Sequence, residues 1–539
     1  MTAKDWNESL KGAVNLSETQ RVVLCMSAAA LPGEALSCDG ASGVMEGAVR
    51  GLTEEKVKPV ACLDALHIGS LKNKSTRDHF QSAVDGMAAF SAKAGTPIMG
   101  GEAYFHPCYD ESALIHVLGI GIPEAGAEDR MTAELLAVPE TPAETVPLPA
   151  VPPDLAQAEG GAAEAEGGKP EAGDGTPGKN PTEEEPLYLV QAKEYDVAGL
   201  PEPKEYGQVL QALLSTPSIS GKGYIYRQFD FGAEPSAVMG PGESGAAVLR
   251  LGGGDGGAAG GVAATMDGNP RYARLDARLG GVIAVCEAAR NLVCVGAKPA
   301  GALAAVYTYD SDGPKARGGL LEAAQALAIP LEVQFRSLSE TDWKEMYATP
   351  VVGMLGVLEN PDHAVRCGFR QEGDVVILLG QNKDELGASI YLSVIHGLEA
   401  GRPPELDLRL EKSVQDVTLE LIQAGLAVSA HDCAEGGLAV ALAESCVTGN
   451  IGVEITLTEA MRPSVFLFGE TQSRIIISTK KEWAERTLSY LAKARIPYQV
   501  VGVVGGNKLR ITGNDYHLIL SLLELEEKYR RHIECVMNG

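Results

Sequence analysis

The segment AHDCAEGGLAVALAE, residues 430–444, places two groups that exchange protons next to a pair of glycines. Its pattern predicts a strand that ends at His431 and Asp432, followed by a helix that begins at Gly436 and Gly437. Unpaired N–H groups at the start of a helix attract anions. These four residues are therefore candidates for binding a phosphate, although a glycine-rich helix start without a ligand fits the same pattern.

A second polar group directly precedes the strand-like run RIIIS and consists of Glu470, Thr471, Gln472 and Ser473. Carboxylate, amide and hydroxyl groups at a strand edge can bind the amides, hydroxyls or phosphate of a substrate. A hydrogen-bonded turn is the alternative explanation for the same residues. The residues alone leave both interpretations open.

Strand and helix patterns alternate on both sides of a long acidic segment. Between Pro123 and Pro186 there are fifteen acidic residues, three basic residues, eleven prolines and no aromatic residue. Such a composition cannot bury enough apolar surface to fold, so we predict a disordered linker over 123–205. An acidic docking tail is the alternative. The predicted domains are 1–122, 206–360 and 361–535.

The first two domains share a pattern of strand, helix, strand, helix and strand. KPVACLDAL at 58–66 parallels KPAGALAAV at 298–306, and each run follows a glycine-rich helix. This similarity predicts an internal repeat. The expected strands are 21–26, 57–66, 114–122, 246–251, 261–267, 297–309 and 349–358, and the expected helices are 41–52, a helix capped by Ser75, 281–295 and 315–328.

The third domain also alternates between strands and helices. The runs GDVVILLG, LAVSAHD, VEITL, SRIIIS, YQVVGVV and KLRITG are typical of strands. The expected helices between them are 383–397, 411–424, 436–448 and 481–494. Alternating elements with short connections predict a layered α+β fold.

The composition excludes several classes of partner. A formal net charge of −27 disfavours binding to nucleic acid or to an anionic membrane, because both carry the same sign of charge. No stretch approaches the roughly 18 apolar residues of a membrane span, and the start of the chain does not resemble a signal peptide. Ten cysteines without a CxxC pair fit reduced thiols, and Cys433 is expected to be structural. We expect a cytoplasmic protein.

A set of motifs occurs in one characteristic order: YIYRQFD, MGPGES, DGNPRYARLD, GGVIAVCEAARNLVCVGAKP, HDCAEGG and FGETQSRIIIS. Together with KPVACLDALHIG and GTPIMGGEAYFHP in the first domain, these motifs resemble formylglycinamidine ribonucleotide synthase of purine biosynthesis. That family belongs to the aminoimidazole ribonucleotide synthetase superfamily. The resemblance implies two A-type sheet domains that pair as a pseudo-dimer, face to face or edge to edge, and one B-type domain. The acidic segment stands where the family has its first B domain.

The family's reaction activates an amide oxygen with ATP, and ammonia then displaces it. This chemistry needs Mg²⁺, a lysine and a histidine, so the resemblance implies ATP, Mg²⁺ and a phosphorylated purine intermediate as ligands. In the first domain, the segment from Met26 to Gly43 has the pattern of a loop, and the family carries its reactive residues in the loop between the first strand and helix. Here, however, Ala29 and Leu31 align with the two family histidines and Ser27 with the metal-binding glutamate. The other aligned positions are Cys25 for the lysine, Gly51 for the aspartate, and Pro32 and Arg50, which match.

The second domain shows similar replacements. Gly245 and Ala304 align with two family aspartates, whereas Ser337 and Ser389 remain. By resemblance, the substrate-binding candidates are Arg50, Ser337, Ser389, Glu470, Thr471, Gln472 and Ser473. Replacement metal ligands would have to come from Glu34, Asp39, Asp64, Glu102 or Asp267, and Asp39 also fits a helix cap. Residues His67, His79, His106 and His116 lack metal-ligand spacing.

The resemblance therefore implies a formylglycinamidine ribonucleotide synthase-like protein whose catalysis is impaired. The first alternative is a ligand-binding or regulatory partner of an active homologue, or of a glutaminase or small subunit that supplies ammonia. The second alternative is a different ATP-dependent reaction on the same scaffold. Retained catalysis would require recruited carboxylates, and constellations of this kind rarely survive piecemeal replacement.

Overall fold

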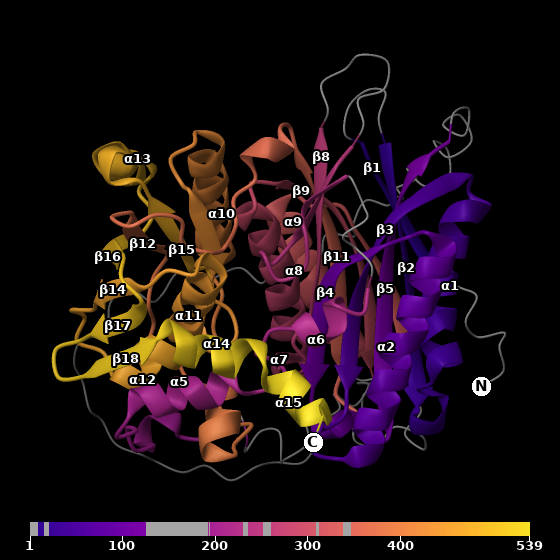
Figure 1. Cartoon of the computed structure of the whole chain (residues 1–539), viewed down its shortest axis with the longest axis horizontal. Coiled ribbons are helices and arrows are strands. Elements are labelled where there is room, and N and C mark those ends of the chain that lie inside the picture. The colour runs from indigo at the N-terminus through magenta and orange to yellow at the C-terminus, as the bar shows by residue number, and fades with distance from the viewer. Residues whose placement is uncertain are drawn as a thin grey trace, which may run out of the picture.

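The computed structural model describes residues 9–15, 21–124, 192, 194–229, 236–251, 260–308, 312–337 and 346–538. Most of the predicted linker, at 125–191, lies outside these residues. The described chain forms three sheets with helices against them (Figure 1). The fold is thus of the layered α+β class, as the sequence predicts.

The first sheet has five strands in the order β1-β2-β5-β3-β4. Its strands are β1 (Leu10–Asn15), β2 (Arg21–Pro32), β3 (Val57–Ile68), β4 (Ile98–Phe105) and β5 (Ser112–Pro123). Helices α1 (Cys38–Glu54) and α2 (Lys74–Ala94) share a core with this sheet. In α2, Phe80, Val84 and Met87 recur at helical spacing and are buried, which explains why this helix packs on the sheet.

The second sheet has six strands in the order β10-β9-β11-β8-β7-β6. Its strands are β6 (Ala237–Met239), β7 (Ala247–Arg250), β8 (Gly261–Asp267), β9 (Lys298–Thr308), β10 (Leu331–Ser337) and β11 (Thr349–Leu358), and its helices are α7 (Pro270–Leu275), α8 (Ala277–Cys294) and α9 (Gly313–Leu327). β9 and β10 are parallel, as β3 and β4 are, and β11 is antiparallel to both neighbours, as β5 is. KPVACLDAL and KPAGALAAV thus lie in equivalent strands, which confirms the internal repeat.

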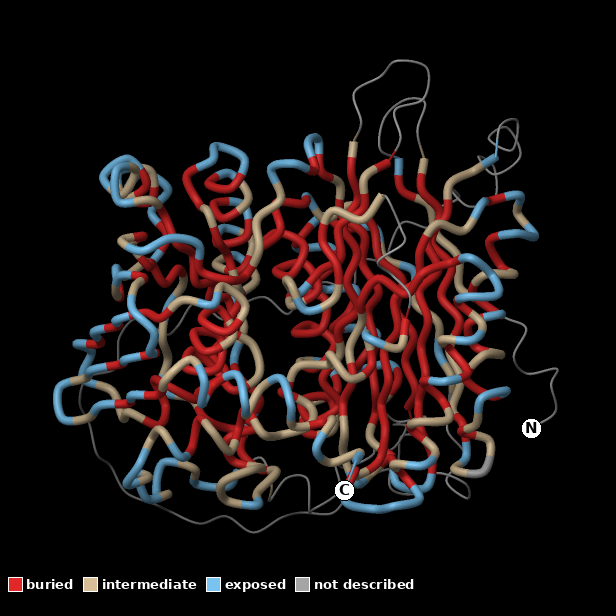
Figure 2. Tube along the Cα trace, in the orientation of Figure 1, coloured by how far each residue is buried: buried red, intermediate tan, exposed pale blue. Residues whose placement is uncertain are grey.

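The two sheets pack face to face, so one of the two predicted arrangements of the pseudo-dimer is present. A single buried cluster contains Met26 and Leu118 of the first sheet together with Leu303 and Leu355 of the second. The fit is close: a Cβ atom at Gly353 would lie 2.8 Å from Cε of Met26. Figure 2 shows the buried strands of both sheets side by side, with exposed residues at the outer loops.

The third sheet has seven strands in the order β13-β15-β12-β16-β14-β17-β18. They are β12 (Val375–Leu379), β13 (Ser429–Asp432), β14 (Val453–Thr456), β15 (Ile475–Thr479), β16 (Tyr498–Val504), β17 (Lys508–Thr512) and β18 (His517–Ser521). The helices with them are α10 (Leu408–Gln423), α11 (Gly437–Gly449), α12 (Pro463–Phe468), α13 (Ala484–Ala494) and α14 (Leu522–Arg530). Two hydrophobic clusters form, one with α11, α12 and α14 and the other with α10 and α13.

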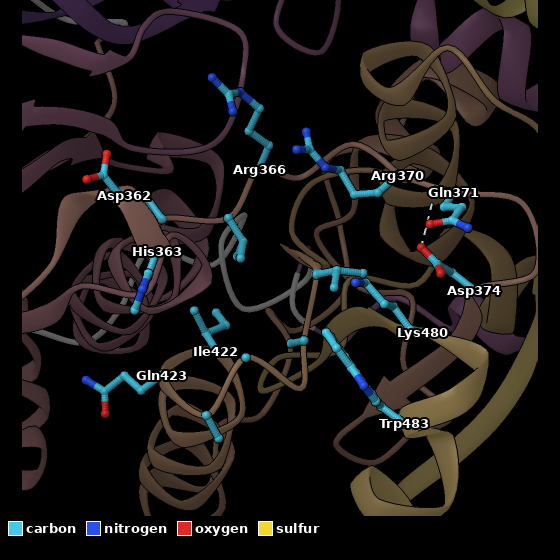
Figure 3. Close-up of a pocket in the computed structure, with 16 residues that line it drawn as sticks. Asp362, His363, Arg366, Arg370, Gln371, Asp374, Ile422, Gln423, Lys480 and Trp483 are labelled. Atoms are coloured by element: carbon cyan, nitrogen blue, oxygen red, sulfur yellow. Dashed lines mark hydrogen bonds between the residues drawn. The ribbon is translucent and has the colours of Figure 1, made fainter.

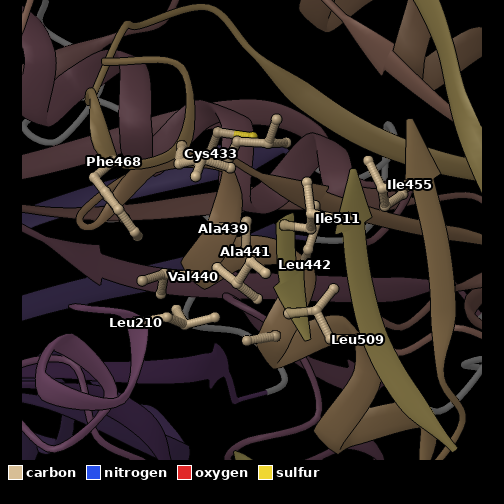
Figure 4. Close-up of a cluster of buried hydrophobic side chains, with 14 of the residues drawn as sticks. Leu210, Cys433, Ala439, Val440, Ala441, Leu442, Ile455, Phe468, Leu509 and Ile511 are labelled. Atoms are coloured by element: carbon tan, nitrogen blue, oxygen red, sulfur yellow. The ribbon is translucent and has the colours of Figure 1, made fainter. Parts of the chain in front are cut away.

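The larger cluster explains the hydrophobic run after the glycine pair. Ala439 and Leu442 of α11 are buried against Leu509 and Ile511 of β17 (Figure 4). Cys433 belongs to the same cluster and is fully buried, and burial raises the pKa of its thiol to about 11. A buried, protonated thiol is a poor nucleophile, which agrees with the structural role expected for Cys433.

Two connecting segments join the third domain to the first. Helix α5 (Tyr206–Leu214) packs in the core of the third domain, and α6 (Gly223–Tyr226) packs in the core of the first. Near the C-terminus, Ile533 of α15 (His532–Asn538) also packs against the first domain. The segment before β6, predicted as the start of the second domain, therefore packs on its neighbours.

Three details differ from the sequence predictions. Met26–Pro32 is not a loop but the second half of β2, because its residues pair with β5 as far as Pro32 with Ser112. The predicted helix at 383–397 is only a π turn at Leu392–His396, since Ala388 donates its N–H to Ala400 and takes a φ of 56°. The helix caps also differ: α2 begins after Asn73 rather than Ser75, and Ser37 rather than Asp39 caps α1.

Candidate functional site at the junction of three domains

A buried arginine links the three domains. Arg271 lies in α7, whose start is fixed by the Asn269 side chain accepting from the N–H of Tyr272. Its Nε donates to the carbonyl of Ala388 at 2.7 Å, its Nη1 to the hydroxyl of Tyr104 at 3.3 Å, and its Nη2 to Oε1 of Glu435 at 3.2 Å. Because Tyr104 belongs to the first domain and Glu435 to the third, this guanidinium fixes all three.

Glu470 is a buried acceptor within the same network. Its Oε1 accepts from the N–H groups of Ile390 at 2.9 Å and Gly436 at 2.8 Å. Its Oε2 accepts from the hydroxyl of Tyr272 and lies 3.5 Å from Nη2 of Arg271. The carboxylate of Glu470 thus orders the glycine turn, and the N–H of Gly436 already has a partner.

A second buried arginine organises the polar segment before β15. Nη1 of Arg290 donates to both carboxylate oxygens of Glu411 at 3.0 Å, and Nη2 donates to Oε1 of Gln472 at 2.7 Å. Ser473, with a φ of 61°, donates from Oγ to Glu411 at 2.6 Å. Thr471 is buried, and its carbonyl accepts from Nε of Arg474 at 3.0 Å. The segment therefore forms a hydrogen-bonded turn, and its polar side chains also converge on Arg290 and Glu411.

His431 and Asp432 form a charged pair at the end of β13. Nε2 of His431 lies 2.8 Å from Oε2 of Glu444, and Nδ1 lies 3.5 Å from Oδ1 of Asp432. Burial alone would lower the pKa of His431, but the contacts with both carboxylates raise it well above its usual value. The N–H of Gly437 donates to Ala434 at 3.1 Å. Phosphate binding at these residues stays a prediction, and any phosphate would have to compete with these contacts.

A group of carboxylates faces the junction from the first two domains. Oδ1 of Asp267 accepts from Asn291 at 2.6 Å and Oδ2 from Thr265 at 2.7 Å, while burial raises the pKa of Asp267 to about 7. Oε2 of Glu102 accepts from the N–H of Gly268 at 3.2 Å. Burial, followed by the charges of Asp267 and Glu435, raises the pKa of Glu102 well above its usual value. These carboxyls can hold protons near neutral pH.

The carboxylates do not assemble a metal site. Among the described residues, no three His, Cys, Asp or Glu side chains are placed to hold one ion. Asp39 lies exposed at the start of α1, whereas Asp64 is buried in β3, where burial raises its pKa to about 8. The described residues therefore do not fit a Mg²⁺ ion.

Histidines gather at one end of the interface between the first two sheets. His67 and His116 are fully buried with ring centroids 5.9 Å apart. Neither ring nitrogen of His67 forms a hydrogen bond with a described residue, and Nε2 lies 3.8 Å from Oε1 of Glu102. Burial lowers the pKa of His67 well below its usual value. Burial lowers the pKa of His116 to about 3. Both rings are therefore neutral near pH 7.

His106 belongs to a separate polar network between the domains. It contacts Oε1 of Glu399, whose Oε2 accepts from Arg274 at 2.9 Å and from the hydroxyl of Tyr347 at 2.7 Å. Sequence reasoning missed the partners of His106 and the roles of Arg271, Arg290, Glu411 and Glu435. The run DGNPRYARLD contained one signal for the role of Arg271, because two arginines occur there in a segment that is otherwise apolar or helix-capping.

The remaining predicted residues lie apart or serve the fold. Arg50 pairs with Glu46 and Glu54 along α1. Oγ of Ser389 donates to the carbonyl of Leu386 at 2.7 Å and accepts from the N–H of Leu392. Ser337 ends β10, and its side chain lies outside the described part of the structure.

The positions aligned with family catalytic groups have different surroundings: Leu31 and Ala304 are buried in strands, Ala29 is half-buried, and Gly245 is exposed in a bend. Leu31 lies in the core formed with α1 and α2, and Ala29 packs against it. Ala304 is fully buried in β9. A Cβ atom at Gly245 would lie 2.0 Å from Oδ1 of Asn291, so the side chain of Asn291 occupies the space that an aspartate would need.

Comparison with protein families supports this architecture. The profile described as AIR synthase related protein, N-terminal domain, matches residues 19–122 and again 243–337, and the corresponding C-terminal domain matches 371–514. Together these matches cover more than half of the chain. The chain belongs to the AIR synthase related family. The two N-terminal-domain matches coincide with the two facing sheets.

Within this family the chain is PurL-like. It is 43% identical over 365 residues to phosphoribosylformylglycinamidine synthase subunit PurL of Moorella thermoacetica, covering 65% of this chain and 49% of that protein. The corresponding protein of Symbiobacterium thermophilum is 40% identical over 362 residues, covering 60% and 46%. The chain thus spans about half the length of the curated relatives that it matches.

Solved structures share the fold over nearly the whole chain. Thermotoga maritima PurL complexed with ADP has a TM-score of 0.55 at 16% identity, covering 93% of this chain and 92% of that one. The PurLQS structure from the same organism has a TM-score of 0.53 at 15% identity. This likeness shows that the chain shares the fold of these structures. No described helix has the length and apolar character needed to cross a membrane.

Proposed function

We propose that the chain is a PurL-like component of purine biosynthesis that binds a phosphorylated pathway intermediate or a nucleotide at the three-domain junction, with its own amidation reaction impaired. The relatives named above are subunits of phosphoribosylformylglycinamidine synthase, and the solved neighbours include PurL bound to ADP. A cytoplasmic location fits this assignment. The chain would then keep the scaffold of the family without its amidation chemistry.

The conformation of Met26–Pro32 carries this proposal. By the resemblance, this segment takes the place of the family's reactive loop, and here it is a regular strand paired with β5. Ala29 and Leu31 point into the helix-covered core and have no group that can transfer a proton. Removing one oriented acid or base lowers a rate by about 10² to 10⁴, so the loss of several should abolish the reaction.

Binding remains chemically reasonable at the junction. The contacts with Asp432 and Glu444 favour the charged form of His431, and burial favours the protonated forms of Asp267 and Glu102, which can donate as well as accept hydrogen bonds. Nearby, the buried Arg271 fixes Glu435 and Glu470, and the buried Arg290 fixes Glu411 and Gln472. A rigid site of this kind suits a polar, phosphorylated ligand.

Turnover and binding can be measured separately on the full-length chain. We expect no ADP above background when the pure protein is incubated with formylglycinamide ribonucleotide, ATP, Mg²⁺ and ammonium. ADP formation that depends on formylglycinamide ribonucleotide would overturn the impairment. We expect formylglycinamide ribonucleotide, ADP or ATP to raise the melting temperature, and Glu435→Gln to weaken that effect. If none of the three stabilises the protein, the binding proposal is wrong.

A regulatory or assembly role is the second candidate. It is favoured by Ala29 and Leu31 at the positions of the family histidines, because an active homologue, a glutaminase or a small subunit would then supply the chemistry that these residues cannot perform. Two other candidates are less favoured: retained catalysis through Asp39, Asp64, Glu102 or Glu34, and a different ATP-dependent reaction. Both need carboxylates gathered at one site, whereas Asp39 is exposed and Asp64 is buried. Co-purification with a catalytically complete PurL tests the assembly role.

A further inference from the structure

A cavity of about 640 Å³ lies in the third domain and shares no lining residue with the three-domain junction. It is formed by the segment 362–371, by the C-terminal end of α10, and by Lys480 and Trp483 after β15 (Figure 3). Its volume falls within the range of about 300 to 1,000 Å³ that is typical of small-molecule sites. The cavity is thus large enough for a mononucleotide or a sugar phosphate.

Two cations in the wall of this cavity form no ion pair with any described residue, although the charge of Lys480 partly offsets the rise that burial causes in the pKa of Asp374. Arg370 is exposed and forms neither a hydrogen bond nor an ion pair within the described part of the chain. The ammonium group of Lys480 lies 4.2 Å from the ring centroid of Trp483 and forms no ion pair with any described residue. The indole therefore holds this cation at the cavity without neutralising it.

The acidic residues of the wall, by contrast, are already engaged. Arg250, which lies outside the cavity, donates to Asp362 through Nη2 at 2.5 Å and Nη1 at 3.3 Å. Asp374 is buried, its Oδ2 accepts from the N–H of Gln371 at 3.2 Å, and burial raises its pKa. The available charge of the cavity is positive, although the whole chain carries a formal charge of −27.

The opposite wall offers hydrogen-bond acceptors. Helix α10 ends at Gln423, and the last carbonyl groups of a helix lack partners within it. No described residue donates to the carbonyls of Gln423 or Ala424. Figure 3 shows Ile422 and Gln423 on one side of the cavity and Arg370 and Lys480 on the other. A ligand that spans the cavity would meet cations at one end and acceptors at the other.

We propose that this cavity binds a ribose phosphomonoester, with the phosphate between Arg370 and Lys480 and the sugar hydroxyls directed toward the end of α10. Arginine and lysine bind phosphate through charge-assisted hydrogen bonds, and hydroxyl groups donate to free carbonyls. A free sugar phosphate and a nucleoside monophosphate share this chemistry. The site is separate from the junction and does not depend on the function proposed for it.

Isothermal titration calorimetry of the full-length chain tests the site with ribose 5-phosphate, AMP, inorganic phosphate and ribose as probes. We expect one of the first two probes to bind more tightly than inorganic phosphate, with binding weakened by added salt. Arg370→Gln and Lys480→Gln should each weaken this binding by about ten-fold or more. Lys481→Gln, which changes an exposed neighbour outside the cavity, should leave it unchanged.

The outcomes separate this site from the junction. Glu435→Gln should not change binding at the cavity, whereas Arg370→Gln should not change stabilisation by formylglycinamide ribonucleotide. Thermal melts of Arg370→Gln and Lys480→Gln confirm folding, which is expected because both side chains lie at the surface of the cavity. Equal binding by wild type and both variants, or binding of inorganic phosphate as tight as that of both esters, would overturn the proposal.

Discussion

Arg271 of the second domain donates to Glu435 of the third at 3.2 Å, and the arginine is almost completely buried. Breaking a buried pair from one side leaves an uncompensated charge and costs about 3 to 5 kcal/mol. Arg271→Met should therefore lower the free energy of unfolding by about this amount, as measured by urea denaturation. The matched control is Arg278→Met, because Arg278 pairs with Glu322 at an exposed site where about 0 to 1 kcal/mol is expected.

The Arg290–Glu411 pair provides a test of coupling. Both side chains are fully buried, so Glu411→Leu alone should destabilise strongly, because Arg290 keeps only the 3.8 Å contact with Asp432 and Ser473 loses its acceptor. The double variant Arg290→Met with Glu411→Leu should recover at least about half of the loss, because no unpaired charge remains. A double-mutant cycle from urea melts measures this. Strictly additive losses would show that the pair does not act as a unit.

Asp64 should make stability depend on pH. Burial raises its pKa from 3.8 to about 8, so the folded protein retains a proton that the unfolded chain releases. The contribution of Asp64 to the free energy of unfolding is then highest below pH 4. It falls as the pH rises toward about 8, by at most about 1.4 kcal/mol per pH unit. Asp64→Asn should flatten the pH dependence of the unfolding free energy between pH 4 and 8. An unchanged slope in the variant would contradict the assignment.

Gly245 tests whether the aspartate of the family can be restored. A Cβ atom there would lie 2.0 Å from Oδ1 of Asn291, so Gly245→Asp should destabilise the protein by about 1 to 3 kcal/mol. Adding Asn291→Ala should recover part of this loss in thermal melts, because the space becomes free. If Gly245→Asp alone is as stable as the wild type, the close approach has no energetic consequence.

The sequence alone was enough to predict the repeat and the layered fold. The apolar periodicity of α2 and the paired KPVACLDAL and KPAGALAAV runs reflect local preferences that each segment carries itself. The resemblance in ordered motifs also indicated the family, which the two matched domain types confirm. Gln472, Ser473 and His431 could also be identified as polar candidates, because each lies next to or within a predicted strand.

Only the tertiary structure decided how those candidates are used. Arg271 reaches Glu435, and Arg290 reaches Glu411, across more than one hundred residues of chain, and no local pattern encodes such a partner. Pairing with β5 converted the expected loop at Met26–Pro32 into a strand, and contact with Ala400 limited the expected helix near Ala388 to a π turn. Local propensity differs by at most about 1 kcal/mol per ordinary residue, so long-range hydrogen bonds and burial determine the conformation wherever they disagree with it.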